Sequence, residues 1–108
     1  MHVVTGKYLK EAVDRFPAAA KQTAAWRSVA RDARWCSPAD VKNIFADADF
    51  NGEYATFRIH QGQYRLVTTI HYSRQQNGRI AEGHIWIRSF LTEKQYENTA
   101  NWDKGVVR

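Results

Sequence analysis

Arginine side chains in the second half of the sequence are the residues best suited to bind a negatively charged group. Between residues 54 and 91 every Lys-or-Arg position is an arginine, and Glu82 is the acidic residue among them. These arginines are Arg58, Arg65, Arg74, Arg79 and Arg88. A guanidinium group is planar, always charged and able to grip a phosphate with two parallel hydrogen bonds. The pattern therefore favours a polyanionic partner such as nucleic acid, although arginines that only keep strand edges soluble would look the same.

Three segments around these arginines have the composition of β-strands. Residues 54–60, 64–73 and 84–90 are rich in aromatic and β-branched side chains. A short turn at 60–63 and a longer loop at 75–83 separate them. Consecutive strands joined in this way predict an antiparallel meander.

Alternation along the strands predicts which arginines are neighbours. Arg65 falls on one face of the middle strand, while Arg88 and Phe90 share a face of the last strand. If Ile85 and Ile87 pack against helices, Arg65 and Arg88 emerge together on the opposite, open face. Two guanidinium groups on one rigid sheet could clamp a phosphate and stabilise charge in a phosphoryl-transfer transition state. Salt bridges at the sheet edges remain the alternative.

Helices are expected on either side of these strands. Thr5 is expected to cap a first helix that Pro17 ends, and a second helix is expected over residues 18–33, so that the two form a helical hairpin. Ser37 and Pro38 suit the start of a short third helix. The fourth is expected from Thr92 to about residue 101, and residues 49–52 are expected to form a turn. This order predicts an α+β fold with the helical hairpin packed on a curved, mainly antiparallel sheet that carries a C-terminal helix.

The histidines and the cysteine do not form a metal-binding pattern. His60, His71 and His84 lie apart, and Cys36 is the single cysteine. Because short His-x-His and Cys-x-x-Cys spacings are missing from the sequence, we expect no metal and a reduced Cys36. Trp86 could stack on a base, but a strand tryptophan more often belongs to a core.

Size and charge limit the class of protein. The 108 residues suit one domain, 1–108, and carry a net charge of +5. No apolar run is long enough for a membrane span or a signal peptide, so we expect a cytoplasmic protein. The arginines at positions 27, 31 and 34 are expected on one exposed helical stripe that could dock an acidic partner.

An ordered set of short segments resembles a known family. The sequence is similar to the HigB toxins of type II toxin–antitoxin systems, which are RelE-like. The segments that carry the resemblance are Met1-His2-Val3-Val4-Thr5, Leu9-Lys10, Phe16-Pro17, Phe57-Arg58-Ile59, Tyr64-Arg65-Leu66-Val67, and Ile85-Trp86-Ile87-Arg88-Ser89-Phe90-Leu91-Thr92 with Tyr96. They span nearly the whole chain in the same order as in the family. The individual segments are short, and the ordered set is the specific signal.

The resemblance implies an endoribonuclease, or mRNA interferase, that cuts messenger RNA on the ribosome without a metal or cofactor. The ribose 2′-hydroxyl would attack the adjacent phosphate, which Arg65 and Arg88 are expected to hold. Tyr96 is a candidate for stacking or proton transfer, with packing of the last helix on the sheet as the alternative, and Glu93 is a candidate catalytic residue. Residues expected to bind RNA are Arg58, His60, His71 and Lys104, with possible help from Arg108. A non-catalytic basic module that binds RNA or the ribosome is the alternative function.

Two positions depart from the family pattern. Glu93 stands where the family often has a histidine, and His60-Gln61-Gly62-Gln63 replaces a Gly-Gly-Asn-Lys type of turn. Glu93 could serve as a general base with a raised pKa, or could simply favour the dipole of the last helix. The implied partners are a HigA-like helix-turn-helix antitoxin, the ribosome and messenger RNA. DNA would be contacted only through the antitoxin, and no membrane is involved.

Overall fold

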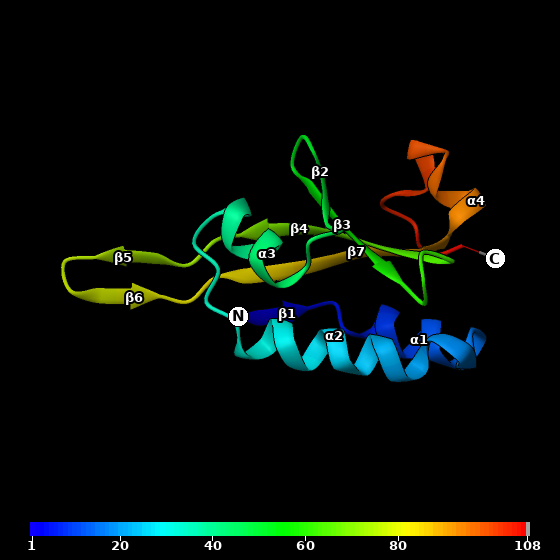
Figure 1. Cartoon of the computed structure of the whole chain (residues 1–108), viewed down its shortest axis with the longest axis horizontal. Coiled ribbons are helices and arrows are strands. Elements are labelled where there is room, and N and C mark those ends of the chain that lie inside the picture. Colours follow the sequence, from blue (N-terminus) through cyan, green and yellow to red (C-terminus); the bar gives the residue numbers. More distant parts are fainter. Residues whose placement is uncertain (108) are drawn as a thin grey trace.

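The computed structural model describes residues 1–107 and forms a mixed α+β fold with a mainly antiparallel sheet (Figure 1). The 6-stranded sheet has the order β1-β7-β4-β3-β2, and β8 pairs with β7. Its strands are β1 (His2–Val4), β2 (Asp49–Asn51), β3 (Tyr54–Ile59), β4 (Tyr64–His71), β7 (His84–Thr92) and β8 (Gly105–Val106). The predicted meander is confirmed as β3, β4 and β7, which pair antiparallel in sequence order.

Helices α1 (Lys7–Arg15) and α2 (Ala20–Asp32) lie along one face of the sheet, below it in Figure 1. The 3-10 helix η1 (Pro17–Ala19) joins them, because Pro17 suits a first helical turn and ends the preceding helix. Helix α3 (Pro38–Ile44) follows, with the predicted cap: the Ser37 side chain accepts a hydrogen bond from the Asp40 amide. These helices bury a core with the inner side chains of the sheet, in which Trp26 of α2 packs with residues such as Phe57 and Leu66 of the strands.

The C-terminal segment covers part of the opposite face of the sheet. Helix α4 (Glu93–Tyr96) and the 3-10 helix η2 (Thr99–Asn101) lie on that side (Figure 1). Val67, Leu91 and Trp102 form a second buried cluster there, with Tyr54 and Tyr96 packed against it. Both faces of the central strands are therefore covered near α4, and the open face expected from the sequence is open only in part.

A bulge in β7 changes the strict alternation of that strand. Val67 pairs with Ser89 and Thr68 pairs with Ile87, so Arg88 is the extra residue between them. Ile85, Ile87 and Phe90 consequently belong to the core beneath the helices, whereas Leu91 belongs to the opposite cluster. The prediction that Phe90 shares a face with Arg88 is wrong, since one extra residue reverses the parity of everything beyond it.

Four local expectations need correction. The Thr5 hydroxyl does not cap α1 but donates a hydrogen bond to the carbonyl of Ile87 (2.7 Å), which ties the end of β1 to β7. Residues 49–51, expected in a turn, form strand β2. The 75–83 loop contains a hairpin of β5 (Arg74–Gln76) and β6 (Arg79–Ala81) that projects from the sheet (Figure 1). The last helix is shorter than expected, because α4 ends at Tyr96 and η2 is separate from it.

Within residues 1–107, no helix combines the length and the apolar character needed to cross a bilayer.

Candidate functional site

Arg65 lies on the face of the sheet that α4 covers, and it is largely buried, with 8% of its surface exposed. Its Nη1 donates a hydrogen bond to the carbonyl of Gly62 in the β3–β4 turn. Its Nη2 lies 3.7 Å from Glu93 Oε1, and its guanidinium lies over the ring of Tyr96, 5.5 Å from the centroid. The Nε is buried without a hydrogen-bond partner among the described residues. Arg65 therefore connects the turn to α4, and its Nε–H group remains an unused hydrogen-bond donor.

Tyr96 is fixed by the C-terminal segment. Its ring stacks on Trp102, with the centroids 4.9 Å apart and the planes 1° from parallel. The Trp102 Nε1 donates a 2.9 Å hydrogen bond to the backbone carbonyl of Tyr96, and Ser89 Oγ donates one of 2.8 Å to the carbonyl of Trp102. The Tyr96 hydroxyl lies 3.4 Å from Thr56 Oγ1. Such a ring is held rigidly, which suits either packing or a defined contact with a ligand.

Arg88 is the more accessible of the two predicted phosphate-binding arginines. Its side chain is 43% exposed, and its Nε donates a 3.1 Å hydrogen bond to Thr69 Oγ1 on β4. The same Nε lies 3.9 Å from Asp103 Oδ1, while Asp103 Oδ2 accepts a 2.6 Å hydrogen bond from the Tyr54 hydroxyl. Arg65 and Thr69 share one face of β4 by alternation, so Arg88 and Arg65 lie on the same side of the sheet, as predicted.

Both arginines have a carboxylate within ion-pair distance, which bears on their ability to bind phosphate. The distances are long, at 3.7 Å and 3.9 Å, and the Glu93 and Asp103 side chains are 67% and 57% exposed. An exposed pair such as Arg88–Asp103 is worth between roughly 0.2 and 1 kcal/mol, since water and salt screen it. A phosphate, which an arginine can grip with two short hydrogen bonds, can compete with such contacts.

Glu93 and Arg58 complete the group around Arg65. Glu93 is the first residue of α4, where its negative charge interacts favourably with the positive end of the helix dipole. Thr92 caps the helix in a capping box, so the predicted cap is confirmed. Arg58 pairs directly with Arg65 across β3 and β4, and its Nη2 lies 3.9 Å from Asp49. The same face thus carries three arginines, each near one exposed carboxylate.

The Tyr54–Asp103 contact has an electrostatic consequence. The hydrogen bond to the Asp103 carboxylate raises the pKa of the Tyr54 hydroxyl, and burial and the negative charges of Asp103 and Glu53 add to this rise. The charge of Arg88 acts in the opposite direction. Tyr54 therefore remains a protonated donor to Asp103 at neutral pH.

One protein family model matches this chain over most of its length. The model of the HigB toxin family, the RelE-like toxic component of a toxin–antitoxin system, matches residues 19–99, well over half of the chain. The chain belongs to the HigB toxin family. The mixed α+β architecture is consistent with a RelE-like fold. No curated protein matches the sequence.

Of the four residues assigned to catalysis, Arg65 contacts both Glu93 and Tyr96, whereas Arg88 lies on the same side of the sheet beside Thr69 and Asp103. The residues assigned to RNA binding do not all lie near this group. Arg58 does, as described above. His60 lies in the turn after β3, where its ring is 6.2 Å from that of Tyr64, a residue packed against the helix-side core. His71 is at the far end of β4, roughly 20 Å from Arg65 at the rise of a strand. Lys104 is exposed beside Asp103, and Arg108 is outside the described residues.

Several residues that shape the site were not predicted from the toxin's sequence. They are Tyr54, Thr69, Trp102 and Asp103. Alternation placed Thr69 on the face of Arg65, which was a usable signal for one of them. Trp102 and Asp103 lie in an irregular segment after the matched region. This segment has no hydrophobic periodicity from which its contact with the sheet could have been predicted.

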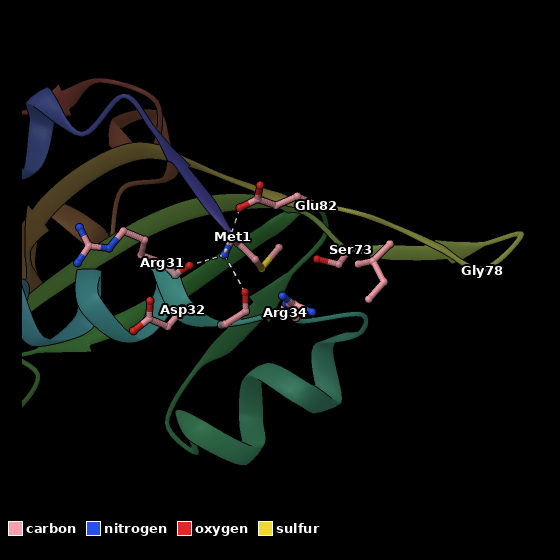
Figure 2. Close-up of a pocket in the computed structure, with 9 residues that line it drawn as sticks. Met1, Arg31, Asp32, Arg34, Ser73, Gly78 and Glu82 are labelled. Carbon is pink, nitrogen blue, oxygen red and sulfur yellow. Dashed lines mark hydrogen bonds and ion pairs between the residues drawn. The ribbon is translucent and has the colours of Figure 1, made fainter.

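The toxin also has a cavity of about 670 Å³ that is remote from these arginines. It lies between the end of α2 and the β5–β6 hairpin (Figure 2). The Met1 ammonium group lies there and donates hydrogen bonds to the carbonyls of Ala30, Arg31 and Ala33.

Arg31 and Arg34 line the cavity, but Arg34 follows the end of α2, so the predicted three-arginine helical stripe is wrong at that position. Trp86, left open by the sequence, is half-buried and 6.4 Å from the His71 ring.

Proposed function

We propose that this toxin is a ribosome-dependent endoribonuclease, an mRNA interferase, that blocks translation by cutting messenger RNA. The observation that supports the proposal most directly is that Arg65 contacts Glu93 and Tyr96 of α4, while Arg88 emerges on the same side of the sheet. Cations can stabilise the charge that develops on the phosphate, and a carboxylate and a phenol can transfer the protons that RNA cleavage requires.

The reaction in this proposal begins with attack of a ribose 2′-hydroxyl on the adjacent phosphorus. The new 2′-oxygen–phosphorus bond replaces the bond to the 5′-oxygen of the next nucleotide. The products are a 2′,3′-cyclic phosphate and a 5′-hydroxyl, and one proton moves from the nucleophile to the leaving group. Because the RNA supplies its own nucleophile, the proposal requires no metal or cofactor.

Arg88 is assigned to the phosphate because its guanidinium is exposed while Thr69 fixes its direction. A fixed cation stabilises the charge that develops on the phosphorane, and losing one such donor typically costs about 100- to 1,000-fold in rate. Arg65 is too buried to bind RNA freely in this arrangement, so it is assigned mainly to holding Glu93 and Tyr96 in place.

Proton transfer is assigned to Glu93 and Tyr96. The Glu93 carboxylate is exposed beside Arg65 and can accept a proton from the 2′-hydroxyl. The Tyr96 hydroxyl, whose nearest described partner is Thr56, can donate a proton to the leaving oxygen. In this assignment Glu93 takes the role that the family often gives to a histidine.

The proposal also covers partners and finer details of the fold. The family implies an antitoxin. We assign it the helix-turn-helix, HigA-like type, with DNA contacted only through it, and place the toxin in the cytoplasm on the ribosome. The N-terminal helical hairpin and the curvature of the sheet are part of the proposed likeness to RelE.

The test is a reaction of purified toxin with ribosomes that carry a defined message. The expected result is cleavage in the decoding site that needs the ribosome, with 2′,3′-cyclic phosphate and 5′-hydroxyl ends. Intact message refutes the endoribonuclease. Salt-sensitive RNA or ribosome binding without cleavage would instead support the non-catalytic binding module.

A further inference from the structure

A pocket of about 430 Å³ lies next to the proposed phosphate-binding arginine. It is lined by Asn51 at the end of β2, by Gly52 of the β2–β3 turn, by Tyr54 at the start of β3, and by Thr99 and Trp102 of the C-terminal segment. Two separate parts of the chain, brought together on one face of the sheet, therefore build its walls. Trp102 lies beyond the part that matches the family model.

The pocket is coupled to Arg88 through neighbouring strands. Tyr54 is directly opposite Thr69 in the β3–β4 register, and Thr69 accepts the hydrogen bond from Arg88 Nε. Asp103 bridges the same groups, because it accepts a hydrogen bond from Tyr54 and lies 3.9 Å from Arg88. Two strand spacings, roughly 10 Å, separate β3 from β7. A nucleotide held by its phosphate at Arg88 is thus close enough for a neighbouring base to reach the pocket.

The aromatic walls are rigid before any ligand binds. The Trp102 ring is stacked on Tyr96 and is met edge-on by Tyr54, with centroids 5.2 Å apart and an interplanar angle of 83°. The Tyr54 hydroxyl is fixed by its 2.6 Å hydrogen bond to Asp103. A preorganised aromatic surface beside a cation is the usual platform for an unpaired base, since every base has a face that can stack.

Polar groups at the rim can distinguish one base from another. Asn51 is exposed and its amide supplies both a donor and an acceptor, which can form a pair of hydrogen bonds with the edge of a base. Thr99, also exposed, adds a hydroxyl to the lining of the pocket. Single-stranded RNA is read in this way, by stacking combined with hydrogen bonds to an open base edge.

We propose that this pocket binds one unpaired nucleobase of the message and contributes to the choice of cleavage site. Tyr54 provides the stacking surface and Asn51 the hydrogen bonds that discriminate between bases. This inference rests on the proposed function, because it assumes that RNA crosses the face that carries Arg88.

The experiment compares cleavage-site maps and single-turnover rates on ribosomes for the wild type and four variants. Asn51→Ala removes the discriminating amide, Tyr54→Leu removes the ring, and Tyr54→Phe keeps the ring without its hydroxyl. Asn43→Ala is the matched control, since Asn43 is exposed on α3, outside the pocket. Thermal denaturation shows whether each variant is folded.

Asn51→Ala is expected to change the distribution of bases at the cleaved positions, whereas Asn43→Ala keeps the wild-type map. Tyr54→Leu is expected to lower the rate at subsaturating toxin by roughly 5- to 150-fold, the range for loss of one stacked base, and Tyr54→Phe by less. Cleavage by the wild type with unchanged maps and rates in folded Asn51→Ala and Tyr54→Leu would overturn the pocket assignment alone. If the wild type leaves the message intact, the proposed function fails and the pocket assignment fails with it.

An antitoxin segment is the competing occupant. If Asn51→Ala and Tyr54→Leu weaken antitoxin binding while the cleavage maps stay unchanged, the pocket is part of the antitoxin interface and the RNA assignment is overturned.

Discussion

Asp103 places a negative charge beside the guanidinium that is assigned to RNA phosphate, and its removal makes a quantitative test. The Asp103 Oδ1 atom is 3.9 Å from Arg88 Nε, and both side chains are about half exposed, at 57% and 43%. Coulomb's law at that distance gives about 1 kcal/mol in water, and measured exposed pairs give roughly 0.2 to 1 kcal/mol. A phosphate that binds Arg88 must overcome this interaction.

Asp103→Asn is therefore expected to tighten RNA binding by roughly 1.5- to 5-fold, which is that energy range converted to an equilibrium constant. Asparagine has nearly the same shape and can still accept the hydrogen bond from Tyr54, so the geometry of the face should be retained. The assay is the Kd of the purified toxin for a short single-stranded RNA, measured at several salt concentrations.

Any variant that loses a carboxylate gains net positive charge, so the control must do the same elsewhere. Asp14→Asn is matched in charge and lies exposed on α1, on the helix side of the molecule. The difference between the two variants should be largest at low salt and shrink as salt rises, because exposed charges are screened. Equal affinities for the two variants, or weaker binding by Asp103→Asn, would refute the assignment of Arg88 to phosphate.

Three further predictions concern stability and titration. Thr92→Ala removes the side-chain cap of α4 and should cost about 1 kcal/mol, or ~4 °C in Tm by calorimetry; an unchanged Tm would show that the cap contributes nothing. Gly62 has a φ of +85° and its added Cβ would lie 3.3 Å from Arg65 Nη1, so Gly62→Ala should destabilise the toxin by roughly 1 to 2 kcal/mol in urea unfolding, and equal stability would contradict this. The raised pKa of Tyr54 means that its contribution to stability is present below about pH 10 and is lost as pH rises through the folded-state pKa. Asp103→Asn removes the carboxylate charge that helps to raise the pKa of Tyr54, so ultraviolet titration should show part of the tyrosine absorbance change moving to lower pH in this variant; an unchanged titration curve would exclude the Asp103 charge as a cause.

The strands and the shared face of the arginines could be predicted because they depend on local composition and alternation. Residues 54–60, 64–73 and 84–90 correspond closely to β3, β4 and β7. Within them, Arg65 and Arg88 were correctly assigned to one side. The parity rule failed only after the bulge at Arg88, where one extra residue moved Phe90 to the core.

The environment of those arginines could not be predicted, because it depends on contacts between distant parts of the chain. Asp103 meets Arg88 and Tyr54 only after the chain has passed through α4 and η2 and returned to the sheet. The burial of Arg65 likewise follows from the way α4 folds over β4. Thr5 was assigned to a helix cap on sequence grounds, but its hydroxyl donates a hydrogen bond to a carbonyl on β7 instead.

The most direct test of the central claim is the single-turnover rate of message cleavage on the ribosome for Arg88→Ala. Arg31→Ala is the control of equal charge, because Arg31 is exposed on α2, away from Arg88. If Arg88 stabilises the phosphorane, its loss should slow cleavage by about 100- to 1,000-fold, while Arg31→Ala cuts at nearly the wild-type rate. Cleavage by folded Arg88→Ala at the rate of Arg31→Ala would contradict the account.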